Sequence, residues 1–435
     1  MIKETSATIL ERFRRDHGRD INLTIRQSYL DLLAALDHPH NKLPPVFHVA
    51  GTNGKGSTCA FLRSILEAAG YKVHVYTSPH LVRFHERIRI AGKLIEEEEL
   101  VETLSLCEKL SRPGEISYFE AATAAAFVAF ARNHADFTIL ETGLGGRLDA
   151  TNVVAKPLAT VITRLSFDHR EYLGNTIAQI AREKAGIMRP AVPCFTAPQP
   201  DQEALSVLQQ EAEKHMAPLF IGNKDWRINS IDHGFRFVDR DRTYELPAPI
   251  LPGEHQFLNA GLAIAALQAA PIKLTSSVIT EGLQKVDWPA RLQQLRQGVL
   301  AKTLPNLWEL WLDGGHNDSA GEVLAAQARA WAVQDAKPLS LILGMLTTKK
   351  PDEFLRPLLP YLDTVQTVAI PDETLSFSAE VLATQTTKLG IKDTRSSIGV
   401  AAALSELYKQ SNQPRRILIA GSLYLAGHVL RLNGA

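Results

Sequence analysis

Residues 46–58 read Val46-Phe47-His48-Val49-Ala50-Gly51-Thr52-Asn53-Gly54-Lys55-Gly56-Ser57-Thr58, an apolar run that enters a glycine-rich turn. Residues 59–69, which follow, have the pattern of an amphipathic helix. A strand, a glycine turn and a helix in this order form a phosphate cradle, because backbone N–H groups and the helix N-terminus attract an anion. We therefore predict phosphate binding, with Lys55 on the outer phosphates and Ser57 or Thr58 near a magnesium ion.

The cradle departs from the common phosphate-loop pattern at one position. That pattern places a glycine where Val49 stands. The alternative is a glycine-rich turn from strand to helix that binds no ligand. Phosphate binding is favoured because the lysine and the hydroxyls occupy the positions that the chemistry needs.

Length and composition indicate a globular protein of two or three domains. The chain has 435 residues, of which 45% are hydrophobic, and it carries 47 basic and 47 acidic residues. A formal net charge of zero argues against a non-specific nucleic-acid binder. Three scattered cysteines suit a reducing compartment. No apolar run approaches the ~20 residues that span a bilayer, and the first residues lack a signal-peptide pattern, so we expect a cytoplasmic protein.

The order of predicted elements indicates an α/β protein. Strands and helices alternate after residue 46, which predicts a mostly parallel sheet with helices on both faces. Short β segments from Trp226 to Leu246 predict a small antiparallel flank. We therefore expect an N-terminal P-loop ATPase-type doubly wound sheet with this flank over residues 1–297. A C-terminal Rossmann-like α/β domain is expected over residues 298–435, with residues 354–362 as one of its helices. Residues 83–90 are expected to form an extended arm.

Three polar residues lie at or just beyond predicted strand ends: Ser78, Glu141 and His169. Because the carboxyl ends of parallel strands share one edge of a sheet, we expect all three beside the cradle. A hydroxyl and a carboxylate are ordinary magnesium ligands, whereas imidazole is a less usual one. Taken singly, Ser78 could be a turn residue and His169 a helix cap.

Three further features could carry chemistry. Lys184 lies near a helix end, where a lysine ordinarily complements the helix dipole. Residues 143–152 follow a strand and contain three glycines, an arginine and an aspartate, which indicates a loop that approaches a ligand closely. Asp313 and His316 follow a strand of the second domain and could meet a nucleotide across an interdomain cleft or belong to a surface turn. No zinc spacing and no Gly-x-Ser-x-Gly elbow is present, which leaves phosphate and magnesium chemistry.

Taken together, these motifs resemble the bacterial folylpolyglutamate synthases of the Mur ligase superfamily, in particular the type that is also a dihydrofolate synthase. The resemblance covers nearly the whole chain. It rests on Gly51-Thr52-Asn53-Gly54-Lys55-Gly56-Ser57, Thr77-Ser78-Pro79-His80-Leu81, Arg83-Phe84-His85-Glu86-Arg87, Tyr118-Phe119-Glu120, Glu141-Thr142-Gly143-Leu144-Gly145-Gly146-Arg147-Leu148-Asp149-Ala150-Thr151-Asn152, Asp168-His169, Glu183-Lys184-Ala185-Gly186-Ile187, Asp313-Gly314-Gly315-His316-Asn317 and Gly421-Ser422-Leu423-Tyr424.

The resemblance implies an ATP site, a metal site and a substrate site. It implies ATP binding by Thr52, Asn53, Gly54, Lys55, Gly56, Ser57, Asn259, Arg291, Asp313 and His316. Magnesium, as two ions, is implied on Ser57, Ser78, Glu141, His169 and Lys184. Lys184 matches a lysine that is carbamylated in this family and then resembles a carboxylate ligand. The substrate residues implied are Asn22, Thr24, Ser117, Tyr118, Phe119, Glu120, Leu148, Asp149 and Ala150. Lys55, Lys184 and His169 are implied as catalytic.

The implied activity is an ATP-dependent amide ligase that adds L-glutamate to dihydropteroate or to the γ-carboxylate of folates through an acyl phosphate. The alternatives are a Mur-type ligase for another acid and a non-catalytic ATP-binding regulator. Glu141, His169 and Lys184 argue against the regulator, which would not need them. We expect small-molecule substrates, no nucleic-acid or membrane partner, and a monomer.

Overall fold

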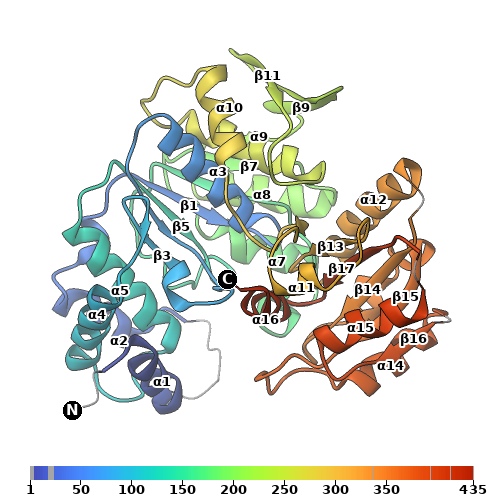
Figure 1. The fold of residues 1–435 in the computed structure, drawn as a ribbon. Helices are drawn as coiled ribbons and strands as arrows, with labels where there is room; N and C mark the ends of the chain where they lie inside the picture. Colours follow the sequence, from blue (N-terminus) through green and yellow to red (C-terminus); the bar gives the residue numbers. More distant parts are fainter. Residues whose placement is uncertain (1–3, 18–23, 336, 392, 412, 435) are drawn as a thin grey trace. The chain divides into compact units, whose positions relative to one another are not determined.

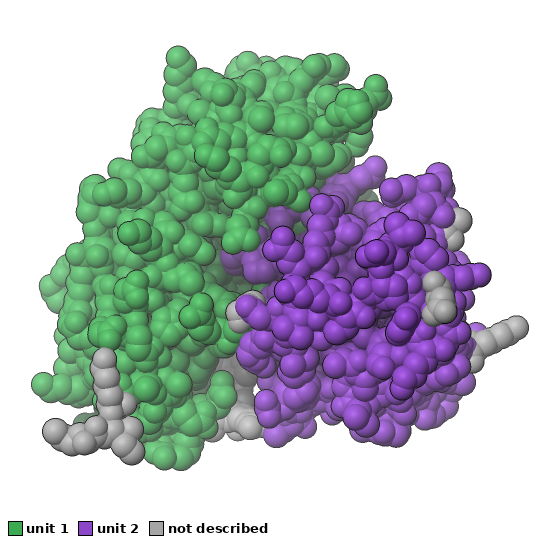
Figure 2. Space-filling model, in the orientation of Figure 1, with its two compact units in different colours: residues 1–250, 256–287 green, residues 251–255, 288–435 purple. Residues whose placement is uncertain are grey.

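A computed structural model describes residues 4–17, 24–335, 337–391, 393–411 and 413–434. The chain forms two compact units, coloured separately in Figure 2. Unit 1 comprises Met1–Ile250 and Gln256–Asp287, and unit 2 comprises Leu251–His255 and Trp288–Ala435. A domain boundary after residue 297 stays a prediction. Asn22 lies outside the described residues.

Unit 1 is built on an eight-stranded sheet of order β4-β3-β2-β5-β1-β6-β7-β8 (Figure 1). Its strands are β1 (Val46–Ala50), β2 (Val73–Tyr76), β3 (Ile88–Ile90), β4 (Lys93–Leu94), β5 (Phe137–Glu141), β6 (Ala159–Ile162), β7 (Cys194–Thr196) and β8 (Leu219–Ile221). The six strands from β2 to β8 in this order pair in parallel, and β3 and β4 add an antiparallel edge. The predicted doubly wound sheet is confirmed.

Helices cover the unit 1 sheet because their apolar residues pack against its buried strands. These helices are α1 (Ser6–His17), α2 (Gln27–Ala35), η1 (Pro39–Asn41), α3 (Lys55–Ala68), α4 (Glu97–Leu110), α5 (Tyr118–Arg132), α6 (Arg170–Leu173), α7 (Ile177–Ala185), α8 (Gln202–Lys214), α9 (His255–Leu267) and α10 (Ser276–Lys285). Residues 120–130 of α5 are buried throughout, as its alanine-rich sequence requires. One core packs α1, α2, α4 and α5 on the sheet, and a second packs α7 and α8.

The predicted antiparallel flank is also confirmed. It consists of β9 (Trp226–Ile231), β10 (Gly234–Asp239) and β11 (Thr243–Pro247), in the order β11-β10-β9. The extended arm expected over residues 83–90 is wrong in its first half, where η2 (Phe84–Arg87) precedes β3. The physical reason is Glu86, whose carboxylate accepts N–H bonds from Leu81, Val82 and Arg83 and closes a turn.

Unit 2 contains a six-stranded sheet of order β12-β13-β17-β14-β15-β16. Its strands are β12 (Gln293–Gln294), β13 (Glu309–Leu312), β14 (Leu339–Leu343), β15 (Leu362–Thr367), β16 (Thr394–Ser396) and β17 (Arg416–Ala420). All neighbouring pairs are parallel except β12 with β13. This order agrees with the predicted Rossmann-like α/β domain.

The helices of unit 2 are α11 (Val299–Lys302), α12 (Asp318–Gln334), α13 (Pro351–Leu355), η3 (Leu359–Tyr361), α14 (Ala379–Lys388), α15 (Val400–Gln410) and α16 (Leu423–Asn433). The single helix expected over residues 354–362 is wrong, since α13 ends at Leu355 and η3 follows. Pro357 and Pro360 explain the break, because proline lacks the N–H that continues an α-helix.

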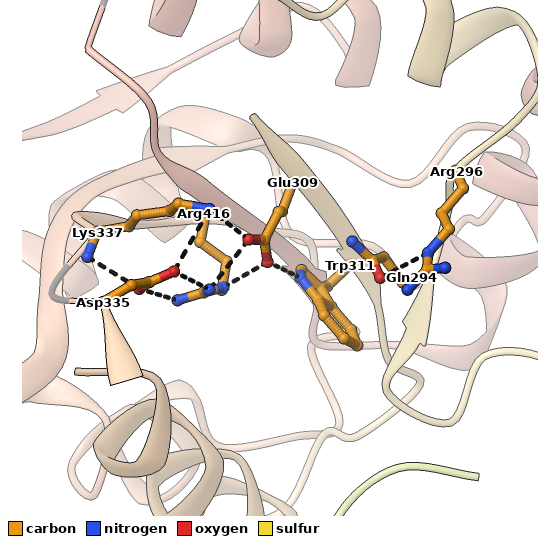
Figure 3. Close-up of polar contacts among 7 residues, drawn as sticks. All are labelled: Gln294, Arg296, Glu309, Trp311, Asp335, Lys337 and Arg416. Atoms are coloured by element: carbon orange, nitrogen blue, oxygen red, sulfur yellow. Dashed lines mark hydrogen bonds and ion pairs between the residues drawn. The ribbon is translucent and has the colours of Figure 1, made fainter. Parts of the chain in front are cut away.

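An ion network around the buried Arg416 anchors the amino ends of β13 and β17 (Figure 3). Arg416, 2% exposed, donates to Glu309 from Nε at 2.8 Å and to Asp335 from Nη2 at 3.0 Å. Lys337 Nζ and Trp311 Nε1 also donate to Glu309, at 2.6 and 3.0 Å. These charges satisfy one another at the edge of the sheet opposite Asp313, so the network stabilises unit 2 and leaves the other edge for a site.

Candidate active site

The glycine turn after β1 has the backbone that a phosphate cradle needs. Gly51 has φ +148°, and a Cβ there would lie 1.8 Å from Thr163 Oγ1. Gly54 has φ +89° and directly precedes α3, so the N-terminus of this 14-residue helix opens on the turn. Thr52 N–H and Asn53 N–H donate to the Arg164 carbonyl, which holds the turn against the loop after β6. Lys55 Nζ lies 3.3 Å from the Thr52 carbonyl oxygen.

Helix α9 places Asn259 against this cradle. A Cβ on Gly54 would lie 2.4 Å from Asn259 Oδ1. The Asn259 amide donates to Gln256 Oε1 at 2.9 Å, and Gln256 Nε2 donates to Ser57 Oγ at 3.4 Å. Two predicted ATP residues that lie about 200 positions apart in the sequence, Ser57 and Asn259, are therefore joined through Gln256.

The neighbouring strands β2 and β5 bring Ser78 and Glu141 together. Ser78 N–H donates to Glu141 Oε2 at 3.3 Å, and Glu141 is buried. His169 follows β6 at the N-cap position of α6 with φ 50°, but its side chain makes no capping hydrogen bond. A helix cap therefore does not account for the imidazole.

Lys184 does not point to solvent as a lysine at a helix end ordinarily would. Its side chain is buried, and Nζ donates to the Gly51 carbonyl at 2.8 Å. Burial, together with the nearby Lys55 charge, lowers the pKa of Lys184 to about 7. Helix α7 thus delivers this amine to the base of the cradle.

The oxygen donors beside the cradle suit magnesium. Glu141 supplies a buried carboxylate, and Ser57 and Ser78 supply hydroxyls. The described residues contain no group of three His, Cys, Asp or Glu side chains that could hold a metal by themselves. This fits Mg²⁺, which keeps water and substrate phosphates among its ligands rather than an all-protein cage.

The predicted substrate residues border the same edge through loop 143–152 and the start of α5. A Cβ on Gly143 would lie 2.4 Å from Phe119 Cζ, so the loop packs directly on that ring. Two cations lie over the Tyr118 ring, with the guanidinium carbon of Arg14 at 5.0 Å and that of Arg87 at 5.8 Å from the ring centre. Thr24 lies in a bend before α2. Tyr118, Phe119 and Leu148 are half-buried in this group.

Several residues predicted to contact substrate also hold the protein's own backbone. Ser117 and Glu120 form a capping box at the start of α5, with bonds of 3.2 and 2.8 Å. Asp149 is buried and accepts N–H bonds from Gly143 and Leu144 at 2.8 and 2.9 Å. Burial raises the pKa of Asp149, while hydrogen bonds to its carboxylate oppose that rise. The Ala150 carbonyl accepts a bond from the Tyr29 hydroxyl at 3.1 Å.

Arg291, Asp313 and His316 form a separate cluster in unit 2. Asp313 accepts N–H bonds from Leu292 and Gly315, both at 2.7 Å. Burial raises the pKa of Asp313, and the nearby Arg291 charge opposes this. His316 Nδ1 lies 3.2 Å from the Gly314 carbonyl oxygen. The structure thus gathers the three predicted nucleotide contacts of this unit at the carboxyl end of β13.

Sequence reasoning gave no role to several residues that shape these clusters: Arg14, Tyr29, Arg87 and Gln256. Only Arg87 lies within a quoted motif. The others carry no local pattern, because their roles arise from helices that pack on distant strands.

Among the described residues, no helix has the length and apolarity to cross a membrane.

Comparison with known proteins places this arrangement in a family. The Mur ligase middle domain matches residues 49–267, and the dihydrofolate synthetase C-terminal domain matches residues 299–432. The dihydrofolate synthase/folylpolyglutamate synthase of Bacillus subtilis is 42% identical over 316 residues, 68% of this chain and 69% of that protein.

Solved structures agree over the full length. Escherichia coli FolC in complex with DHPP and ADP has a TM-score of 0.87 and 32% identity, covering 99% of this chain and 98% of that one. A bifunctional folylpolyglutamate synthase/dihydrofolate synthase with Mn, AMPPNP and L-glutamate bound has a TM-score of 0.84 and 30% identity, with 99% and 98% covered. The chain therefore belongs to the dihydrofolate synthase/folylpolyglutamate synthase family of the Mur ligases.

Proposed function

We propose that this protein is an ATP-dependent ligase that adds L-glutamate to dihydropteroate, to the γ-carboxylate of folates, or to both. The observation that carries the proposal is the convergence of Lys184 and the phosphate cradle, with Nζ 2.8 Å from the Gly51 carbonyl, beside the Ser78–Glu141 pair. The bound ADP, DHPP and L-glutamate of the related structures support the same substrates here.

The reaction proceeds in two steps. A substrate carboxylate oxygen attacks the γ-phosphorus of ATP, the bond to the β-phosphate oxygen breaks, and an acyl phosphate and ADP form. The amine of glutamate then attacks the acyl carbon, the bond to phosphate breaks, and an amide and inorganic phosphate remain after a proton leaves the nitrogen. Both steps need alignment of the groups and exclusion of water.

The chain's own residues hold the charged groups for these steps. The ammonium of Lys55 and the N-terminus of α3 attract the phosphates of ATP. Loop 143–152 and the Tyr118 and Phe119 rings border the place of the acid. Ser57, Ser78, Glu141 and His169 would hold Mg²⁺, as two ions, and the metal would neutralise the charge that develops on the transferred phosphoryl group. Asn259, and the unit 2 cluster of Arg291, Asp313 and His316, would contact the nucleotide.

Lys184 is proposed to act as a carbamate. Its amine is buried beside the cradle, with Nζ 2.8 Å from the Gly51 carbonyl oxygen. A depressed amine pKa, lowered by burial, favours the neutral form that reacts with carbon dioxide. Carbamylation converts a cation that would repel Mg²⁺ into an anion that attracts it.

Purified protein tests the proposed activity with ATP, Mg²⁺ and glutamate. Dihydropteroate and a reduced folate are offered separately, and ADP and each amide product are measured. We expect ADP release to require both an acid and glutamate. Release that is indifferent to both would reject the ligase, and turnover only with a different acid would establish another Mur-type ligase. A monomeric, cytoplasmic protein is proposed alongside, to be checked by light scattering and cell fractionation.

A further inference from the structure

A chain of buried hydrogen bonds runs from the central strand to the substrate loop. His48 lies in β1, and its Nε2 is 2.8 Å from Thr151 Oγ1. Thr151 Oγ1 is in turn 2.5 Å from Asp149 Oδ1. All three side chains are at most 4% exposed, so water does not compete for these bonds.

The direction of each hydrogen bond follows from proton counting. The Asp149 carboxylate is an acceptor, because it also receives N–H bonds from Gly143, Leu144 and Thr151. The Thr151 hydroxyl must therefore donate its only proton in the hydrogen bond to Asp149. Its oxygen is left to accept from His48, which requires the proton of the ring to sit on Nε2. Burial lowers the pKa of His48 to about 3, so the ring stays neutral with this single tautomer.

These hydrogen bonds act on the carboxylate whose other oxygen holds the loop in shape. Asp149 Oδ2 accepts hydrogen bonds from the amides of Gly143 and Leu144, which follow β5 after Thr142. Oδ1 is the oxygen that Thr151 orients. A rotation of the Asp149 carboxylate would break its hydrogen bonds to the loop backbone. Leu148 and Ala150 would then lose their positions beside the substrate.

We infer that His48 is a positioning residue, which orients Asp149 through the Thr151 hydroxyl and so sets the affinity for the acid substrate. The inference deepens the proposed function and rests on it. His48 touches no substrate in this scheme. Its effect is on the pterin or folate acid and not on ATP. Within the part of the protein that the structure describes, the side-chain hydrogen bonds of His48, Thr151 and Asp149 lead to loop 143–152 and not to the phosphate cradle.

Four variants and one control test the inference by steady-state kinetics. His48→Leu and Thr151→Val each remove one buried hydrogen bond and should raise KM for the acid about three- to ten-fold, with KM for ATP unchanged. The double variant should be no worse than Thr151→Val, because the chain is already broken there. His48→Gln carries an amide N–H close to the position of ring Nε2 and should restore most of the affinity.

His74 provides the matched control. It is a fully buried histidine of the same sheet, but its ring bonds lead to Asn133 and Ala91 rather than to loop 143–152. His74→Leu should lower thermal stability to a similar degree and leave KM for the acid unchanged. A rise in KM for the acid in this control, or an equal rise in both KM values in His48→Leu, would overturn the inference.

A nuclear magnetic resonance measurement separates this inference from the proposed function. In the long-range proton–nitrogen spectrum, the histidine signal that disappears in His48→Gln should show the Nε2–H tautomer. An Nδ1–H tautomer overturns the inference whatever the activity. If the wild-type protein ligates glutamate but His48→Leu and Thr151→Val keep the wild-type KM, the inference fails and the function stands. If the wild type forms no amide, the proposed function is rejected, and so is the claim that His48 sets the affinity for the acid substrate.

Discussion

The substitution Gly54→Ala tests how the cradle and α9 fit together. Gly54 stands at φ +89° before α3, and a Cβ there would lie 2.4 Å from Asn259 Oδ1. Gly70, just past the other end of α3, has φ +90° and no atom within 4 Å of an added Cβ. The two glycines therefore share the same backbone strain, and only Gly54 adds an overlap. Gly70→Ala is the matched control.

The expected cost can be assembled from these two contributions. A left-handed backbone costs an L-residue about 1–2 kcal/mol, and this cost lowers the free energy of unfolding of both variants. In Gly54→Ala the Asn259 side chain must also rotate away and break its 2.9 Å bond to Gln256, which adds about 0.5–1.5 kcal/mol. Gly54→Ala should thus lower the free energy of unfolding by about 1.5–3.5 kcal/mol, and Gly70→Ala by about 1–2 kcal/mol.

Urea unfolding and ATP kinetics measure the two consequences. Displacement of Asn259 from the cradle should raise KM for ATP about ten-fold in Gly54→Ala, equivalent to about 1.4 kcal/mol, and leave it unchanged in Gly70→Ala. In an Asn259→Ala background the overlap is gone, so the cost of Gly54→Ala should fall to that of Gly70→Ala. Equal destabilisation by the two single variants, with KM for ATP unaltered in both, would refute the packing of Asn259 on the cradle.

Three further predictions concern charge. Lys55→Ala should reduce ADP formation at least about a hundred-fold in a coupled assay, and retained turnover would reject its role on the phosphates. Lys184→Ala should lose activity and regain part of it with added short carboxylic acids. Labelled bicarbonate should give a carbamate carbon signal only in the wild type. Absence of both effects argues against carbamylation. Burial raises the pKa of Glu309, but its hydrogen bonds with Arg416, Lys337 and Trp311 outweigh burial and lower the pKa from 4.5 to about 2. Its stabilisation, about 1–3 kcal/mol after solvent screening, is therefore full above pH ~4.5 and is lost as the pH falls toward 2. Glu309→Gln should flatten this acid limb in urea titrations, and an unchanged limb would contradict the assignment.

Local sequence patterns predicted most of the elements and the edge at which the site lies. The cradle, the α/β alternation and the antiparallel flank are visible because each depends on neighbouring residues. Residues 354–362 do not form the single helix expected, because Pro357 and Pro360 lack the N–H that continues an α-helix. The arm at 83–90 failed because the bonds of Glu86 to three backbone amides are not a periodic signal.

The roles of individual side chains were harder to anticipate than their location. Ser117 and Glu120 were expected at the substrate, and the structure shows them capping α5. Asp149 was expected to face the substrate, and its oxygens hold Gly143, Leu144 and Thr151. A motif records which residue types occur together, whereas hydrogen-bond partners depend on how a loop closes on itself.

The sequence alone determined that a phosphate cradle follows a central strand and that polar residues end the neighbouring strands. These features follow from local backbone preference and from the alternation of strand and helix. The tertiary structure decided which distant side chains meet: Lys184 with the Gly51 carbonyl, Asn259 with Gly54, and His48 with Thr151. The physical reason is that strand pairing and helix packing join segments that are distant in the sequence. The order β2-β5-β1-β6 aligns the strand ends at one edge of the sheet, and helices α7 and α9 bring Lys184 and Asn259 to the turn after β1, which no single segment specifies.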